Sequence, residues 1–472
     1  MSIQGRRRTS NVQRHAPHAL TLSRCTLART PAGRLFIRET TLIINMQTSI
    51  PARISVSLLK ATAFLWLFAW SSLADDWAQW RGPHRDGVSA EKGLLRTWPN
   101  DGPPLVWQVA DLGTGYSAPA IVGDRIYLLG NEGLENEYVQ ARSARDGKRL
   151  WSARVGNVGN PKQDPNFPAA RSTPVVAEKV LYALGSDGDL VCLETATGKE
   201  RWRKSLRADF GGQPGIWAYA ESPLLDGEQL ICTPGGSNAT LVALNKNTGA
   251  VLWRCAVPGG DEASYSSAIV VEAGGVRQYV QFLAKGLVGV DAKSGKFLWR
   301  YDKTASGSPA VILTPIAQED LVYSGAYRVG GGLIKLKPVQ GGVEPEQIYF
   351  SPKLPIGIGG VVKTGDYFYG STSQAYLCVE FASGAVKWEE RTSPAASCYA
   401  DGRLYLHAED GQVLLLEPSP EGFHELGRFA PPEQPKRIDA MEKAWAYPVI
   451  ASGRLYIRDA GKLWCYDVAA KR

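Results

Sequence analysis

The chain has 472 residues, of which 44% are hydrophobic and 21% charged, so it is large enough for an extensive folded core. Its formal charge of +7 comes from the first 74 residues, because residues 75–472 hold 43 basic and 45 acidic residues. This balance excludes the basic field that nucleic-acid binding requires. The 50 Gly, 29 Pro and 14 Trp favour an all-β protein with short strands and many turns.

Residues 46–74 have the composition of a signal peptide. Arg53 and Lys60 precede an apolar run, Ala61–Trp70, and small residues follow at Ser72-Leu73-Ala74. Because the run is too short to span a bilayer comfortably, we expect cleavage and export without an integral membrane span. The predicted location is therefore the periplasm or the extracellular space.

Two further features of this leader affect its interpretation. No Cys follows the apolar run, so a lipid anchor would lack its acceptor. Met46 stands where an export signal of ordinary length would begin. We therefore interpret residues 1–45 as a start assigned too far upstream, the alternative being an extended leader. Residues 75–103 form a lead segment that we expect to pack against the main domain.

A repeated unit fills the rest of the chain. A tight turn followed by a strand that ends in Trp recurs, and the Gly of each turn supplies the positive φ that such turns need. The copies run as Asp146–Trp151, Thr197–Trp202, Thr248–Trp253, Ser294–Trp299 and Ser383–Trp388. An apolar strand precedes each turn, and a short opening strand that often carries Pro begins each unit. Each unit is thus predicted to be a four-stranded sheet.

One four-stranded sheet leaves two apolar faces uncovered, so such units must stack, and closing the row into a ring removes the ends. Opening strands lie near residues 118, 173, 222, 267, 314, 359, 396 and 447, which predicts an eight-bladed β-propeller over 104–468. In the fifth unit Tyr349-Phe350 replaces the Trp. The last unit stops after its third strand, and 104–109, with Trp107, is predicted to supply the fourth and to close the ring.

The repeat resembles the PQQ-like repeat of quinoprotein alcohol dehydrogenases and of the outer-membrane assembly scaffold BamB. The lead sequence from Asp76 to Gly87 is similar to the N-terminal segment of many such propellers. The resemblance implies a propeller, but it does not choose a function, because the family includes enzymes and non-enzymes.

Six tryptophans are predicted to have a structural role. They recur at one position of the repeat, where each would dock between adjacent blades and bury a large apolar surface. They are Trp107, Trp151, Trp202, Trp253, Trp299 and Trp388.

A second group of residues precedes the opening strands, whose starts are expected to cluster at one mouth of the central channel. Aromatic faces and a guanidinium there could hold a planar anionic ligand, such as a quinone cofactor or a sugar acid. The alternative is a mouth filled with side chains and water. The candidate cofactor-binding residues are Tyr116, Arg171, Tyr219, Tyr265 and Trp445.

Resemblance to the quinoprotein dehydrogenases would imply PQQ, a Ca²⁺ held by carboxylate and amide oxygens, and often a disulfide between adjacent cysteines. The chain has no Cys-Cys pair, and Asp187-Gly-Asp189 falls at an ordinary hairpin turn. No catalytic residue and no metal ligand is identified. We expect no cofactor, or PQQ with calcium if the protein is an enzyme.

The cysteines give a further expectation. Cys192, Cys378 and Cys465 share one repeat position with Ala and Gly, which indicates a small buried site. The pairing of Cys232, Cys255 and Cys398 stays open.

The sequence therefore predicts an exported, monomeric binding scaffold of the cell envelope that resembles BamB. Its partner would be an envelope protein or a small ligand at the channel mouth. The alternatives are a PQQ-dependent dehydrogenase of alcohols or sugars and a carbohydrate-binding propeller. The longest aperiodic insertion, Asn157–Ala170, is a candidate recognition loop.

Overall fold

The structure is a computed structural model, and it describes residues 20–29, 35–44 and 76–471 except 163–166, 341, 438 and 440. The chain divides into two compact units, Met1–Leu73 and Ala74–Arg472. In the first unit β1 (Leu20–Arg29) pairs antiparallel with β2 (Leu35–Ile44). The predicted signal peptide and its cleavage site lie outside the described residues.

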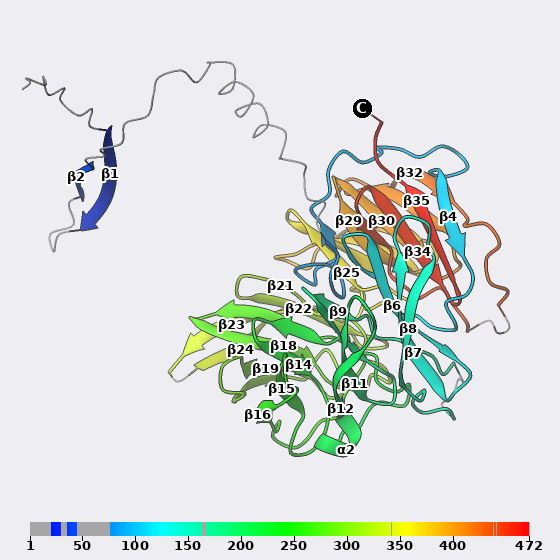
Figure 1. Cartoon of the computed structure of the whole chain (residues 1–472), viewed down its shortest axis with the longest axis horizontal. Coiled ribbons are helices and arrows are strands. Elements are labelled where there is room, and N and C mark those ends of the chain that lie inside the picture. Colours follow the sequence, from blue (N-terminus) through cyan, green and yellow to red (C-terminus); the bar gives the residue numbers. More distant parts are fainter. Residues whose placement is uncertain are drawn as a thin grey trace, which may run out of the picture. The chain divides into compact units, whose positions relative to one another are not determined.

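The second unit confirms the predicted eight-bladed propeller of four-stranded antiparallel blades (Figure 1). Blade 1 comprises β5 (Ala120–Val122), β6 (Arg125–Glu132), β7 (Asn136–Ser143) and β8 (Arg149–Gly156), and blade 2 comprises β9 (Val175–Ala177), β10 (Val180–Leu184), β11 (Asp189–Glu194) and β12 (Glu200–Ser205). Blade 3 comprises β13 (Leu224–Asp226), β14 (Gln229–Cys232), β15 (Leu241–Asn245) and β16 (Val251–Cys255), and blade 4 comprises β17 (Ile269–Ala273), β18 (Val276–Phe282), β19 (Leu287–Asp291) and β20 (Phe297–Tyr301).

Blades 5 to 8 continue the ring. Blade 5 comprises β21 (Ile316–Gln318), β22 (Leu321–Ala326), β23 (Gly330–Val339) and β24 (Gly342–Ser351), and blade 6 comprises β25 (Val361–Thr364), β26 (Tyr367–Ser371), β27 (Ala375–Glu380) and β28 (Val386–Arg391). Blade 7 comprises β29 (Ala395–Ala400), β30 (Arg403–Ala408), β31 (Val413–Glu417) and β32 (His424–Phe429), and blade 8 comprises β33 (Val449–Ala451), β34 (Arg454–Asp459), β35 (Lys462–Asp467) and β4 (Leu105–Val109).

The eighth blade is assembled from both parts of the unit. β4, drawn in light blue, lies beside β35, drawn in red, and pairs with it antiparallel (Figure 1). Cys465 of β35 stands opposite Trp107 of β4, the same pairing of a small residue with Trp that blades 1 to 4 and blade 6 show. The outermost strand of the last blade therefore comes from the beginning of the propeller sequence.

The middle strands are apolar throughout because neighbouring blades cover both of their faces. In blade 2, Leu190–Leu193 of β11 are all buried, whereas the outer strand β12 alternates between exposed and half-buried residues. A short helix, α2 (Leu206–Phe210), follows β12 and is capped at its N-terminus by the Ser205 side chain. No helix in the described part of the chain is long and apolar enough to cross a membrane.

The docking tryptophans share one local geometry. Trp202 stands opposite Cys192, and Trp151 stands opposite Ala141, so a small residue makes room for each indole. A register shift follows directly in each of the eight blades. Such bulges increase the local twist of an outer strand and so discourage edge-to-edge pairing.

Four of the docking indoles, those of Trp107, Trp151, Trp202 and Trp253, also rest on the turn glycine of the next blade. A Cβ on Gly198 would lie 2.6 Å from the Trp151 ring, and Gly198 has φ +73°. Gly is therefore required there both for the turn conformation and for the close approach of the ring. The Nε1 of Trp151 donates to the Thr195 carbonyl of blade 2, and Trp202 donates to Lys246 of blade 3. Tyr349 replaces Trp in blade 5, as predicted, and its ring covers Gly384.

Candidate functional site at the channel mouth

Three of the five predicted mouth residues form one cluster. The Arg171 guanidinium lies over the Tyr116 ring at 5.2 Å, and the Tyr116 and Trp445 rings are 5.0 Å apart. Phe167 meets Trp445 edge-on at 6.3 Å, and its carbonyl accepts a 2.9 Å hydrogen bond from Arg171. We call Tyr116, Phe167, Arg171 and Trp445 the mouth cluster. It joins loops from blades 1, 2 and 8.

The backbone before β5 and β9 positions this cluster. The Tyr116 amide donates to the Ala170 carbonyl at 2.8 Å, which holds the two strand entries side by side. Gly115 has φ +156°, and a Cβ there would lie 2.6 Å from Nη2 of Arg458. Gly115 is thus needed because a buried guanidinium from blade 8 passes directly beside it.

Tyr265 and Tyr219 are placed differently. Tyr265 packs against Trp217 at 5.6 Å, and its hydroxyl accepts from the Trp217 amide at 3.2 Å. Tyr265 is near enough to Arg171 to interact with it electrostatically. Tyr219 is only 1% exposed, and its hydroxyl donates to the Pro234 carbonyl at 2.9 Å. It is a core residue between blades 2 and 3 and does not face the mouth.

Burial dominates the electrostatics of the mouth. It lowers the pKa of Arg171 and raises the pKa of Tyr116, so an anion would meet a desolvated cation there. Below this pair, burial raises the pKa of Glu137 to about 7. Glu137 Oε2 accepts hydrogen bonds from the Ser186 amide and hydroxyl, and these bonds connect blade 1 to blade 2.

Several polar residues near the mouth are missing from the sequence-based set. His407 is buried, with Nδ1 2.9 Å from the Ala446 carbonyl, and burial lowers its pKa. Arg458 donates through Nη1 to the Ser117 and Leu129 carbonyls of blade 1. Arg437 makes two hydrogen bonds to Asp459. A signal was present for two of them, because His407 and Arg458 directly follow the apolar triplets Leu404–Leu406 and Leu455–Ile457 of their strands.

The other end of the channel is closed by the lead segment. Residues 76–89, which we call the plug, hydrogen-bond to seven of the eight blades, all but blade 4. The contacts are Trp77 with Ile121, Ala78 with Val176, Arg85 with Ser222 and Pro223, Trp80 with Thr314, Arg81 with Val361, Gly87 with Tyr399, and Ser89 with Ile450.

Trp80 is the part of the plug that lies against the innermost residues of the channel. Its ring packs on Tyr447 at 4.5 Å and contacts the small cluster formed by Ala118, Ala396 and Tyr447. These residues come from blades 1, 7 and 8, and Thr314, which accepts from the Trp80 indole, comes from blade 5.

Within the described ranges, no three His, Cys, Asp or Glu side chains are grouped to hold a metal. Asp187 and Asp189 lie at a hairpin, where they pair with Arg207 and Arg203. The six cysteines after residue 75 are all buried and free, so Cys232, Cys255 and Cys398 form no disulfide.

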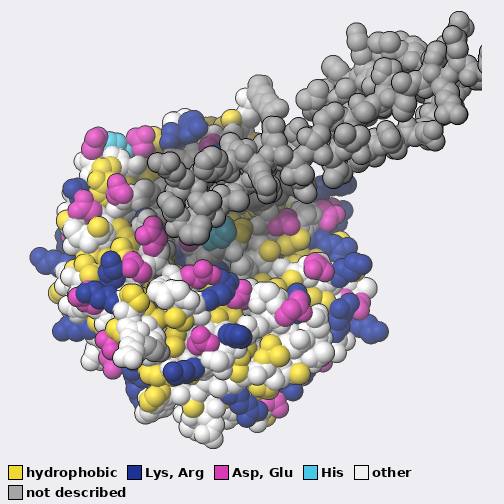
Figure 2. Space-filling model, turned by 90° about the vertical axis from the view of Figure 1, so that its left-hand side faces the viewer, with side chains coloured by type: hydrophobic (Ala, Val, Ile, Leu, Met, Phe, Trp, Pro, Cys, Tyr) yellow, Lys and Arg dark blue, Asp and Glu magenta, His cyan; other side chains and the backbone are white. Residues whose placement is uncertain are grey.

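Charge on the surface is mixed. Figure 2 shows Lys and Arg side chains interspersed with Asp and Glu over the face turned to the viewer. This agrees with the near-neutral balance of residues 75–472.

Comparison with known proteins gives two kinds of relative. The chain is 29% identical over 140 residues to the outer membrane protein assembly factor BamB of Alkalilimnicola ehrlichii, covering 30% of this chain and 32% of that protein. It is 24% identical over 291 residues to the quinoprotein alcohol dehydrogenase PedH of Pseudomonas putida, covering 58% of this chain and 47% of that enzyme. The matches thus span about a third to a half of the length of these relatives.

A solved structure shares the fold. The crystal structure of BamB from Moraxella catarrhalis superposes with a TM-score of 0.54 at 14% identity, covering 78% of this chain and 98% of that one. The family model described as outer membrane protein assembly factor BamB matches residues 135–390. Because this match covers more than half of the sequence, the chain belongs to that family of PQQ-like repeat propellers.

Proposed function

We propose that this protein is exported and acts as a binding scaffold of the cell envelope, with loops of the mouth face contacting a protein partner. Membership of the BamB family supports this role, and so does the partial match to a BamB of Alkalilimnicola ehrlichii. The remaining support comes from the surface of the mouth face, on the side of blades 1 to 3.

The observation that carries the proposal is a pair of exposed apolar residues on hydrogen-bonded loops. Leu134, in the hairpin between β6 and β7, is 45% exposed, and Ile216, before blade 3, is 55% exposed. The loop that starts at Asn157 connects them, because Val158 donates to the Leu134 carbonyl and Asn160 donates to the Ile216 carbonyl. Apolar side chains held on ordered loops are typical of protein contact sites.

Site-specific photocrosslinking in intact cells tests this role. A photoreactive residue at Ile216 should crosslink to an envelope protein, and mass spectrometry of the adduct should identify it as a component of outer-membrane protein assembly. The matched control is Asp124, in the turn between β5 and β6 at the plug end, whose side chain is 89% exposed. Equal crosslinking from both positions, or none from Ile216, would contradict the proposal.

A second candidate is a PQQ-dependent dehydrogenase of alcohols or sugars, favoured by the mouth cluster and the match to PedH. Arg171 would hold a carboxylate of the quinone, Tyr116 and Trp445 would contact its ring, and PQQ would supply the two-electron oxidation chemistry. Titration with PQQ separates the candidates, because the scaffold role requires no resident cofactor. Calcium-dependent binding that is lost in Arg171→Met would favour the dehydrogenase.

A further inference from the structure

Blade 7 lacks the docking aromatic of its own outer strand. Its register places Gly427 opposite Leu415, the position at which the other outer strands have Trp or, in blade 5, Tyr. A bulge follows this pair, as it does in every blade. The outer half of blade 7 would therefore contain a hole about as large as an indole ring.

Trp98 of the lead segment occupies this hole. A Cβ on Gly427 would lie 2.6 Å from the Cβ of Trp98, so the two residues share one site. The Trp98 ring is 5.9 Å from Tyr405, and Trp202 stands 5.8 Å from the equivalent Tyr182 in blade 2. Trp98 is only 7% exposed. Its indole thus takes the place of a docking Trp, supplied from a distant part of the sequence.

The residues around Trp98 fasten it to blades 7 and 8. We call residues 93–103 the strap. The Trp98 amide donates to the Leu426 carbonyl of blade 7, while Leu95 donates to the Val468 carbonyl after blade 8. Leu94 donates to the Asp401 carboxylate at 2.9 Å. The strap therefore crosses the seam between the two blades and leads directly into β4.

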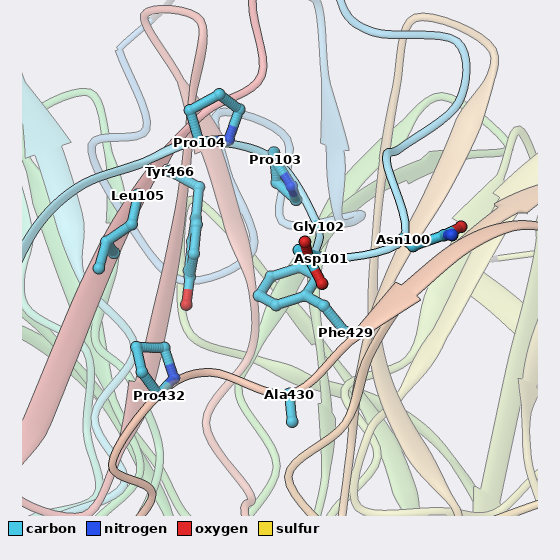
Figure 3. A pocket seen from close by; sticks show the side chains of 10 residues that line it. All are labelled: Asn100, Asp101, Gly102, Pro103, Pro104, Leu105, Phe429, Ala430, Pro432 and Tyr466. Atoms are coloured by element: carbon cyan, nitrogen blue, oxygen red, sulfur yellow. The ribbon is translucent and has the colours of Figure 1, made fainter.

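Gly102 of the strap imitates the turn of an ordinary blade. It has φ +80°, and a Cβ there would lie 2.5 Å from the Phe429 ring, as turn glycines elsewhere lie under docking aromatics. Figure 3 shows Phe429 beside Gly102 and the prolines that follow it. The groove drawn there, of about 540 Å³, separates this end of the strap from Pro432 and Tyr466. A second groove, of about 490 Å³, lies along Trp98 and β32.

The indole of Trp98 is less completely bonded than its counterparts. In blades 1 and 2 the Nε1 of the docking Trp donates to a carbonyl of the following blade. Nε1 of Trp98 has no hydrogen-bond partner among the described residues. The Trp98 indole is thus held by packing and by the strap backbone, without the hydrogen bond that its counterparts make.

We propose that the strap is a releasable clasp and that the ring opens first at the seam between blades 7 and 8. Because blade 7 is completed by a residue from outside its own sequence, release of the strap removes its docking aromatic and uncovers Phe429 in one step. The plug precedes the strap and also pairs with β29 of blade 7 through β3 (Val88–Ser89). Opening of the seam therefore loosens the plug as well. This inference is independent of the proposed binding partner.

Hydrogen exchange on residues 75–472, with the full set of blades present, tests the clasp. Trp98→Gly should raise exchange in the strap, in β32 and in the plug by about tenfold or more, the change that a loss of about 1.4 kcal/mol produces. The matched control is Trp151→Gly, which removes a docking Trp supplied by its own blade. It should raise exchange in blades 1 and 2 and leave the strap unchanged.

A second pair of variants keeps the test decisive if Trp98→Gly unfolds. Gly427→Trp alone should be destabilised, because its Cβ collides with Trp98. Combined with Trp98→Gly, the same substitution should restore protection of β32 while the strap still exchanges rapidly. Equal effects of Gly427→Trp in both backgrounds, or unchanged plug exchange in Trp98→Gly, would overturn the proposal.

Discussion

The two ends of the channel are filled in different ways. The plug end is closed by one continuous backbone segment, whose Arg81 and Arg85 donate to carbonyls of blades 6 and 3. At the mouth, side chains from separate loops meet, with the Tyr116 and Phe167 rings packed against Trp445. A backbone segment can move only as a unit, whereas side chains can rearrange singly. The comparison predicts that substitutions at the plug end destabilise the ring more than substitutions at the mouth.

The largest expected effect is the loss of Arg85. Its guanidinium is 3% exposed, makes two hydrogen bonds to blade 3 and contributes to the charge environment of buried Glu221. Arg85→Met should lower the free energy of unfolding by about 3–5 kcal/mol, because it leaves a buried group without its partner. Urea denaturation at neutral pH measures this. His84→Met, at an exposed neighbour, is the control. If the free energy of unfolding falls equally little in both variants, the plug does not stabilise the ring.

The buried carboxylate near the mouth gives a pH-dependent effect of intermediate size. The pKa of Glu137 is raised from 4.5 to about 7, because burial in the folded protein disfavours the ionised carboxylate. At low pH the carboxyl is protonated in both the folded and the unfolded chain, and folding carries no ionisation cost. As pH rises between these two values, the unfolded chain loses this proton first, so the free energy of unfolding declines. Glu137→Gln keeps an acceptor for Ser186 and does not ionise. Its free energy of unfolding should exceed that of the wild type by about 3 kcal/mol at pH 8 and should equal it at pH 4.

Denaturation of both proteins at a series of pH values checks that prediction. Glu221→Gln is the matched control, because both of its oxygens accept hydrogen bonds, from Thr233 and Gln281, and an amide cannot replace both. At pH 8 the free energy of unfolding of Glu221→Gln should therefore rise less above the wild-type value than that of Glu137→Gln. A wild-type stability that rises between pH 5 and 8 because of Glu137 would contradict the assigned direction.

A smaller effect is expected at the mouth. Trp445 is half-buried and lies on loops, so Trp445→Ala should cost less than the roughly 3–5 kcal/mol of a fully buried Trp. Trp299→Ala, which removes a docking Trp that is 3% exposed, is the comparison. Thermal unfolding of the two variants measures the difference. If Trp445→Ala were the more destabilised protein, the mouth would have to be counted among the structural parts of the ring.

The smallest effect concerns the proposed contact surface. Ile216→Asp should change the free energy of unfolding by no more than about 0.5 kcal/mol, since its side chain is largely exposed. The same change should abolish the partner crosslinks obtained from a photoreactive residue at Leu134. Retained crosslinking in a folded Ile216→Asp variant would show that the surface does not include this residue.

The repeat pattern was enough to predict the blades, because turn Gly and docking Trp recur at fixed spacing and each contact is local to a repeat. Trp98 was not predictable in this way, since it lies outside any repeat and its partner is a glycine. The mouth was predicted in part. Tyr219 and Tyr116 occupy equivalent positions in their repeats, so the spacing predicted that both would face the mouth. The Tyr219 ring instead turns into the core, where it needs Gly212, because a Cβ on Gly212 would lie 2.3 Å from the Tyr219 hydroxyl. Loop conformation, which spacing does not encode, decided this difference.

The central proposal is that this family member acts as a scaffold, and from it we predict that the mouth binds no quinone. Calorimetric titration of residues 75–472 with PQQ, with and without Ca²⁺, tests it most directly, and total Trp fluorescence gives a second readout of binding. The account predicts no binding at high micromolar PQQ. Binding at micromolar or lower concentration that depends on Ca²⁺ and disappears in Arg171→Met would contradict it and assign the mouth to catalysis.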